Sequence, residues 1–187
     1  MFMILLKEKK YGGDNMLKIL GSLIVFISCS LAGFIYGEGL RKRVVELRLL
    51  EDSMQQLQNQ IAYSHTPLPL AFESIGLKMR EPIKKLYLDM ALILNSNEVE
   101  SVYEAFKKAI EINIKNLSLK TQDITLLMDF AKTLGQFDIE GQNNMFNLIF
   151  KNINKELDIA EEKMHKNLKM YRGLGVSAGA IIVILLL

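Results

Sequence analysis

The sequence predicts an all-α protein, an antiparallel bundle of about six helices whose first and last helices continue into a membrane. Two apolar segments without charged residues or His, Ile19–Gly37 and Gly173–Leu187, lie towards the two ends of the chain. Between them, apolar residues recur at steps of three and four, and no segment alternates with the period of a β-strand. We therefore divide the chain into residues 1–15, 16–40, 41–172 and 173–187.

The first apolar segment is expected to be a transmembrane helix, because roughly 20 helical residues cross the apolar core of a bilayer. A signal peptide is the alternative, but Ile19–Gly37 is long for one and no clear cleavage site is followed by an independent mature domain. Residues 1–15 are expected to be a non-native or disordered extension. They show no periodicity, and Met16 directly precedes the span.

The second apolar segment, Gly173–Leu187, is shorter than a full span. We expect it to cross the membrane nevertheless, because Ile181–Leu187 has no polar face that could lie in the interface. An interfacial or half-inserted tail is the alternative. Both spans have basic residues on the side of the central domain: Arg41, Lys42, Arg43 and Arg48, then Lys163, Lys166, Lys169 and Arg172. This distribution predicts a two-span protein whose central domain is cytoplasmic.

The helical bundle is expected to comprise residues 41–172. The first helix carries an apolar stripe from Leu47 to Ile61 and stops before Pro67, with Thr66 capping the second helix and Pro67 at its first position. Pro82 opens a third helix, which ends at Asn95–Asn97, and a fourth begins at about Glu98. A fifth begins near Thr121 and ends at Gly135, where a left-handed terminator is expected. Asp138 caps the last helix, which runs on into the second span.

Small residues four apart let membrane helices approach each other closely. Gly33 and Gly37 lie at the domain-side end of the first span, and Gly175 and Gly179 at the domain-side end of the second. They predict a hairpin of the two spans. Contact with another subunit, including a second copy, and the general frequency of glycine in membrane helices are the alternatives.

The sequence offers no catalytic, cofactor-binding or metal-binding residues. The central domain is almost neutral, which argues against a nucleic-acid surface. The chain has two His residues, His65 and His165, and no group with metal-ligand spacing. It has no glycine-rich phosphate loop followed by Lys and Ser or Thr. Asp138 and Glu140 are explained by a helix cap and a favourable first-turn charge.

Four short strings occur in an order and spacing that resemble stage III sporulation protein AB of endospore-forming bacteria. They are Met16–Gly21, Tyr63–Leu68, Leu134–Asp138 with Gln142, and Lys169–Gly175. The resemblance covers Met16–Leu187. It implies a component of the channel apparatus in the mother-cell membrane around the forespore, with a soluble region similar to the cytoplasmic domain of type II secretion and type IV pilus platform proteins.

The resemblance also implies partners: a secretion-type ATPase, stage III sporulation protein AA, and other membrane subunits. The resemblance implies no catalytic residues. The residues of the matching strings are caps and turns or, alternatively, partner contacts: Tyr63, His65, Thr66, Pro67, Leu68, Gly135, Asp138 and Gln142. The expected function is a non-enzymatic, membrane-anchored assembly protein. A membrane-tethered helical sensor or regulator is the alternative. A membrane enzyme is disfavoured, because it would need polar groups converging at the membrane face and the sequence shows only the basic flanks there.

Overall fold

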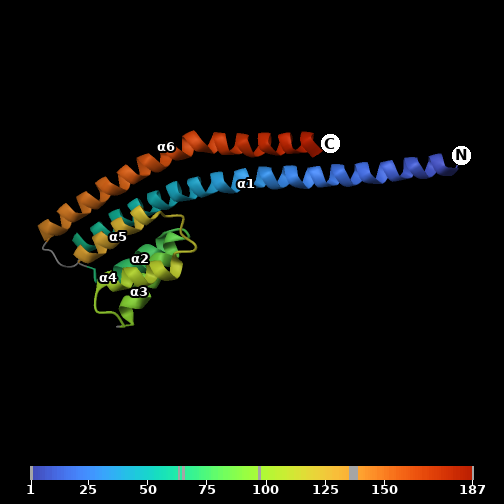
Figure 1. Ribbon diagram of the computed structural model, residues 1–187. Coiled ribbons are helices and arrows are strands. Elements are labelled where there is room, and N and C mark those ends of the chain that lie inside the picture. Colours follow the sequence, from blue (N-terminus) through green and yellow to red (C-terminus); the bar gives the residue numbers. More distant parts are fainter. Residues whose placement is uncertain (1, 63, 65, 97, 135–138, 187) are drawn as a thin grey trace. The chain divides into compact units, whose positions relative to one another are not determined.

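The computed structural model describes residues 2–62, 64, 66–96, 98–134 and 139–186, with side chains for part of them. These residues form six α-helices and no strand, which confirms the all-α class (Figure 1). The helices are α1 (Phe2–Ala62), α2 (Leu68–Lys78), α3 (Ile83–Asn95), α4 (Val102–Asn113), α5 (Thr121–Thr133) and α6 (Ile139–Leu186). The chain divides into two compact units, Met1–Leu40 with Lys163–Leu187, and Arg41–Glu162.

The first unit contains the two apolar segments as parts of α1 and α6. Many of its apolar side chains are exposed, for example Ile35 at 71% and Ile184 at 75%. The hydroxyls of Ser28 and Ser177 donate to carbonyls of their own helix, at Ile24 and Leu174, so these polar groups are bonded without an outside partner. Among the described residues, only α1 is long and apolar enough to cross a membrane, a property that signal sequences and buried core helices share.

The second unit includes the C-terminal part of α1 and the N-terminal part of α6, and these two segments run antiparallel. Arg48 of α1 bonds Glu161 of α6 at 2.6 Å, and further along α1 Gln58 donates to Asn143 of α6 at 3.3 Å. A later residue of α1 therefore contacts an earlier residue of α6, which confirms that the two helices run antiparallel. The stripe expected in α1 is buried from Leu47 to Leu57, where Leu47, Leu50, Met54 and Leu57 are all at most 2% exposed, and its last member, Ile61, is half-buried.

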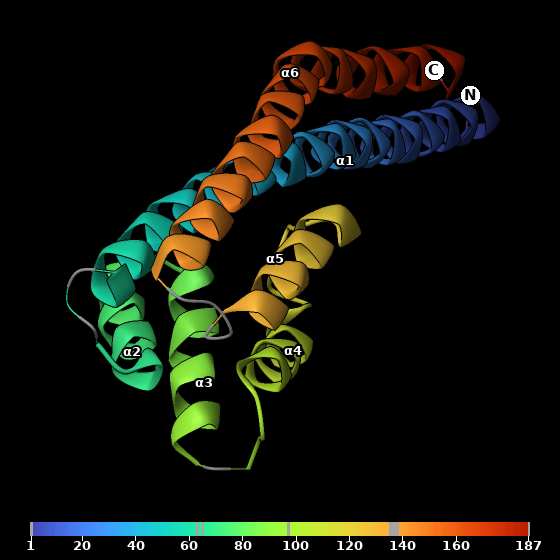
Figure 2. The same ribbon diagram turned by 90° about the vertical axis from the view of Figure 1, so that its left-hand side faces the viewer.

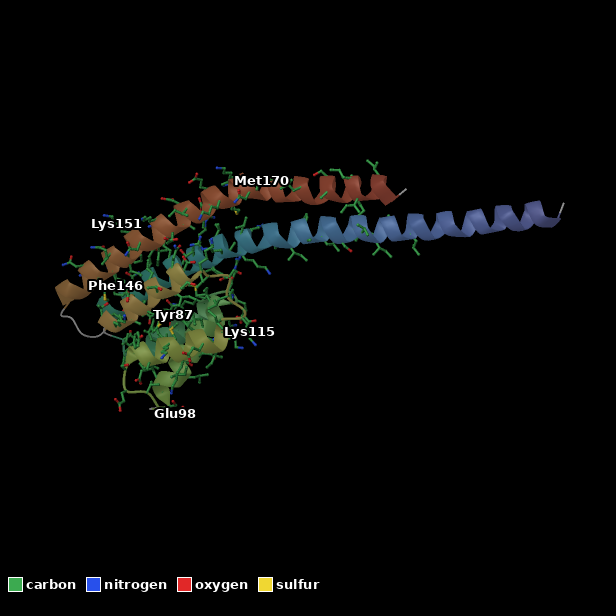
Figure 3. All side chains as sticks on the ribbon, in the orientation of Figure 1. Tyr87, Glu98, Lys115, Phe146, Lys151 and Met170 are labelled. Carbon is green, nitrogen blue, oxygen red and sulfur yellow. The ribbon has the colours of Figure 1, made fainter. Side chains whose placement is uncertain are left out.

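Helices α2, α3 and α4 lie side by side in the second unit (Figure 2). Their core is aromatic: the ring of Phe72 meets Tyr87 edge-on at 5.8 Å and Phe106 at 5.6 Å. Figure 3 marks Tyr87 within this group of helices. Helices α2 and α3 pack closely at Gly76, where a Cβ atom would lie 2.8 Å from Leu88 Cδ2 and 3.2 Å from its backbone nitrogen. A side chain at this position would therefore require Leu88 to shift.

Two helix starts differ from the sequence prediction. The prediction that Thr66 caps α2 is wrong, because Pro67 precedes the helix and its carbonyl accepts from Ala71 N at 2.9 Å. Helix α4 begins at Val102, four residues after the predicted Glu98. Its cap is Ser101, whose hydroxyl accepts from Glu104 N at 3.2 Å, while the Glu104 carboxylate accepts from Glu100 N at 3.1 Å. Gly135 and Asp138, predicted as terminator and cap, lie outside the described residues.

Candidate partner-docking groove

The end of α1 and the start of α6 lie at the same end of the bundle. The α1–α2 junction follows Ala62, one turn after Gln58, and α6 begins at Ile139, one turn before Asn143. The hydrogen bond between Gln58 and Asn143, which lie 85 residues apart in the sequence, therefore brings the last turns of α1 and the first turns of α6 to the same end. The charged contacts of Arg43 and Arg48 with α6 lie towards the opposite end of this helix pair.

Only part of the candidate set can be placed in the structure. Thr66 and Leu68 are half-buried and Pro67 is exposed. Thr66 N donates to Gln60 O at 3.0 Å, a contact that fixes the turn after α1. Gln142 lies in the first turn of α6, and its side chain is outside the described part of the chain. Tyr63, His65, Gly135 and Asp138 also lie outside the described residues. Their expected role in partner contacts stays a prediction.

A groove of about 700 Å³ lies between α5 and α6. Its α5 wall is Gln122, Thr125, Leu126, Asp129, Phe130 and Thr133, and its α6 wall is Gly141, Asn144, Met145, Leu148, Ile149 and Asn152. Gly141 and Thr133 place one end of the groove beside the α5–α6 junction. The groove thus begins at the end of the bundle where α1 ends and α6 begins.

Aromatic packing supports the groove from below. Phe130 of α5 and Phe146 of α6 meet edge-on at 5.2 Å, and both are buried. Phe146 also stacks with Phe150 at 6.2 Å; Figure 3 marks Phe146 near the start of α6. At the rim, Leu148 is 60% exposed although it is a large apolar residue. An apolar floor with an exposed apolar rim is suited to bind an apolar surface of another molecule.

The groove carries little charge. Among the described residues that line it, only Asp129 is charged, and its carboxylate pairs with Lys132 at 2.9 Å. Lys132 also lies 5.6 Å above the ring of Tyr103, and the pairing with Asp129 raises the pKa of its ammonium. The other polar lining groups are amides and hydroxyls, which can bond a peptide backbone without attracting strong charge. The groove therefore favours a largely uncharged, apolar segment.

Sequence reasoning did not identify the groove, although one signal was present. Phe146, Ile149 and Ile153 form the buried stripe of α6, and Leu148 lies off this stripe. A large apolar residue on the polar face of a helix suggests a contact outside the fold. Among the described residues no group of three His, Cys, Asp or Glu side chains could hold a metal ion.

Comparison with known proteins adds to this geometry. The family model described as stage III sporulation protein AB matches residues 18–187. The chain belongs to this family. Stage III sporulation protein AB of Bacillus subtilis (strain 168) is 28% identical over 172 residues, which cover 92% of this chain and 100% of the relative. The resemblance stated from the four strings is therefore confirmed.

A solved structure of stage III sporulation protein AB is also similar to this chain. It matches with a TM-score of 0.62 at 26% sequence identity and covers 66% of this chain and 96% of that chain. The match supports the helical fold through structure as well as through sequence.

Proposed function

We propose that this protein is a non-enzymatic, membrane-anchored assembly component of a secretion-like sporulation channel between mother cell and forespore. In this proposal the bundle binds a secretion-type ATPase, stage III sporulation protein AA, and other channel subunits bind elsewhere on the chain. Family membership supports the link to sporulation. The α5–α6 groove is the observation that supports protein binding, because it offers an open, nearly uncharged apolar surface.

The proposal places the protein in the mother-cell membrane around the forespore, with both apolar segments spanning it. The exposed apolar side chains of the first unit, such as Leu23, Ile27 and Ile184, suit contact with lipid. The bundle is then cytoplasmic, and residues 1–15 lie outside the functional chain. Reporters fused before Met16, in the Asn95–Asn97 turn and after Leu187 test this topology. A cytoplasmic signal from the Asn95–Asn97 reporter alone is the expected result, and an external signal there contradicts it.

The groove gives the proposal a direct test. Leu148→Asp places a charge on the exposed apolar rim, and Leu92→Asp makes the same change at a leucine of α3 that is 67% exposed. Burying a leucine is worth about 1.5–3 kcal/mol, which corresponds to an affinity change of roughly ten- to a hundredfold. Leu148→Asp should therefore weaken ATPase binding by at least about tenfold in a pull-down or titration with the full-length protein in detergent.

The control variant Leu92→Asp should bind like the natural protein. Equal binding by both variants, each with the natural helical circular dichroism spectrum, would show that the groove is not the docking site. A sensor or regulator remains the second candidate, because a groove of this size also falls in the range of small-ligand sites. Thermal stabilisation of the protein by an apolar small molecule, lost in Leu148→Asp, would favour that function.

A further inference from the structure

A buried arginine joins three helices of the bundle. Arg43 of α1 is 4% exposed. Its Nε donates to Asp123 Oδ2 at 2.8 Å, and its Nη2 donates to Asp123 Oδ1 at 2.7 Å and to Glu156 Oε2 at 2.9 Å. Asp123 is on α5 and Glu156 on α6. One guanidinium thus bonds both helices that form the walls of the groove.

The α5 side of this contact is fixed where the helix begins. Asp123 is 2% exposed and also accepts a hydrogen bond from Lys120 N at 2.7 Å, which satisfies a backbone donor at the start of α5. One turn along α1, Glu46 accepts from Ser118 N in the segment before α5 at 2.7 Å. The start of α5 is therefore held by two side chains of α1.

The charged cluster lies next to the groove but does not line it. Asp123 and Glu156 border a small void together with Leu126, Leu127 and Ile153. Leu126 lines the groove as well. A change in the distance between Asp123 and Glu156 would therefore move the α5 wall of the groove at Leu126. None of Arg43, Asp123 and Glu156 would touch a molecule bound in the groove.

Charge explains why the two walls depend on Arg43. Without the guanidinium, two carboxylates would face the same buried region and repel each other, which favours separation of α5 and α6. The hydrogen bond from Arg43 to Asp123 raises the pKa of the guanidinium, so the cation persists throughout the accessible pH range. The planar fork of arginine bonds Asp123 through two nitrogens and Glu156 through one of them, whereas the three donors of a lysine ammonium all lie on a single nitrogen.

We propose that Arg43 is a positioning residue that sets the spacing between the α5 and α6 walls of the groove. Removing its bond to either wall should widen the groove or make its width variable. The spacing itself is a property of the fold, and only its effect on partner affinity rests on the proposed function.

The spacing can be measured between spin labels in the full-length protein. Cys29 is the single cysteine, so Cys29→Ser provides a background for labels at Thr125→Cys on α5 and Leu148→Cys on α6. Glu156→Ala removes the bond from Arg43 to α6 and leaves the two bonds between Arg43 and Asp123. Its matched control is Glu161→Ala, which cuts the other ion pair between α1 and α6, Arg48–Glu161, and does not involve α5.

Glu156→Ala should shift the label distance upwards or broaden its distribution, and Glu161→Ala should leave it unchanged. Arg43→Lys should broaden it as well, although the charge is kept, because one ammonium cannot reproduce the fork. A merely stabilising role predicts lower melting temperatures with an unchanged label distance at a temperature where all variants are folded. That result in Glu156→Ala would overturn the proposal.

Partner affinity gives the second measurement. Glu156→Ala should weaken ATPase binding by about tenfold, the factor that corresponds to about 1.4 kcal/mol, and Glu161→Ala should not. Should the natural protein fail to bind the ATPase, the proposed function is wrong, while the label distances still decide the role of Arg43. Widened walls with unchanged affinity in a protein that does bind would refute the effect on the partner.

Discussion

Removing the carboxylate of Asp123 should be among the most destabilising single changes to a polar residue of this bundle. Asp123→Ala deletes both bonds from Arg43 to α5 and the bond from Lys120 N. Arg43, 4% exposed, is then left with Glu156 alone. Removing one partner of a buried ion pair costs about 3–5 kcal/mol, because the remaining charge stays out of water.

An exposed ion pair in the same protein provides the comparison. The side chain of Arg48 is 62% exposed in its pair with Glu161, so Arg48→Ala should cost no more than about 1 kcal/mol. At about 4 °C for each kcal/mol, Asp123→Ala should lower the melting temperature by roughly 12–20 °C and Arg48→Ala by at most about 4 °C. The assay is thermal unfolding of the full-length protein in detergent, followed by circular dichroism.

A double variant separates charge burial from simple loss of contacts. Arg43→Met together with Asp123→Ala removes the buried cation as well, so it should melt at a higher temperature than Asp123→Ala alone. The reasoning is refuted if Asp123→Ala is no less stable than Arg48→Ala, or if the double variant shows the sum of the two single losses.

Two further predictions concern other parts of the bundle. Burial raises the pKa of Glu46, more than its bond from Ser118 N and the nearby Lys42 lower it. The contribution of this group to stability is therefore greatest below the ordinary Glu pKa of about 4.3 and is lost as pH rises through the folded-state pKa, so Glu46→Gln should stabilise the protein at pH 7 but not at low pH. Gly76→Ala should lower the melting temperature by up to about 8 °C, since the clash with Leu88 costs as much as about 3 kcal/mol and the gain in helix propensity offsets only roughly 1 kcal/mol of it.

Urea unfolding at pH 4 and pH 7 checks the first of these, and a stability difference that does not change with pH would contradict it. For Gly76, the matched control is Gly39→Ala, because a Cβ atom at Gly39 would meet nothing within 4 Å. A melting temperature of Gly76→Ala equal to or above that of Gly39→Ala would show that α3 yields at the contact.

Local patterns in the sequence predicted much of the fold. The apolar stripe from Leu47 to Leu57 indicated the buried face of α1, and Pro67 and Pro82 marked helix boundaries within a residue or two. The start of α4 was predicted too early because Val99 continued the apolar spacing. Ser101 and Glu104, three apart, were the better signal, since a hydroxyl and a carboxylate at that spacing satisfy free backbone donors.

The site was less accessible to sequence reasoning. Sequence reasoning interprets Arg43 only as one of the basic residues flanking a span, although its position four residues before Leu47 continues the spacing of the buried stripe of α1. Its partners Asp123 and Glu156 are 80 and 113 residues away, so the pairing exists only once α1, α5 and α6 have packed. The groove is likewise a property of two helices together. Leu148 off its stripe could have suggested an outside contact, but not which helix forms the opposite wall.

The antiparallel pairing of α1 and α6 determines how the bundle would bear a mechanical load. Arg41 and Glu162, the first and last residues of the bundle, lie at the same end of this helix pair, close to the contact of Arg48 with Glu161. A force that draws these two residues apart would act on the Arg48–Glu161 contact before the one between Gln58 and Asn143. The pair would therefore open like a zipper, one contact after another, and not yield as a whole under shear.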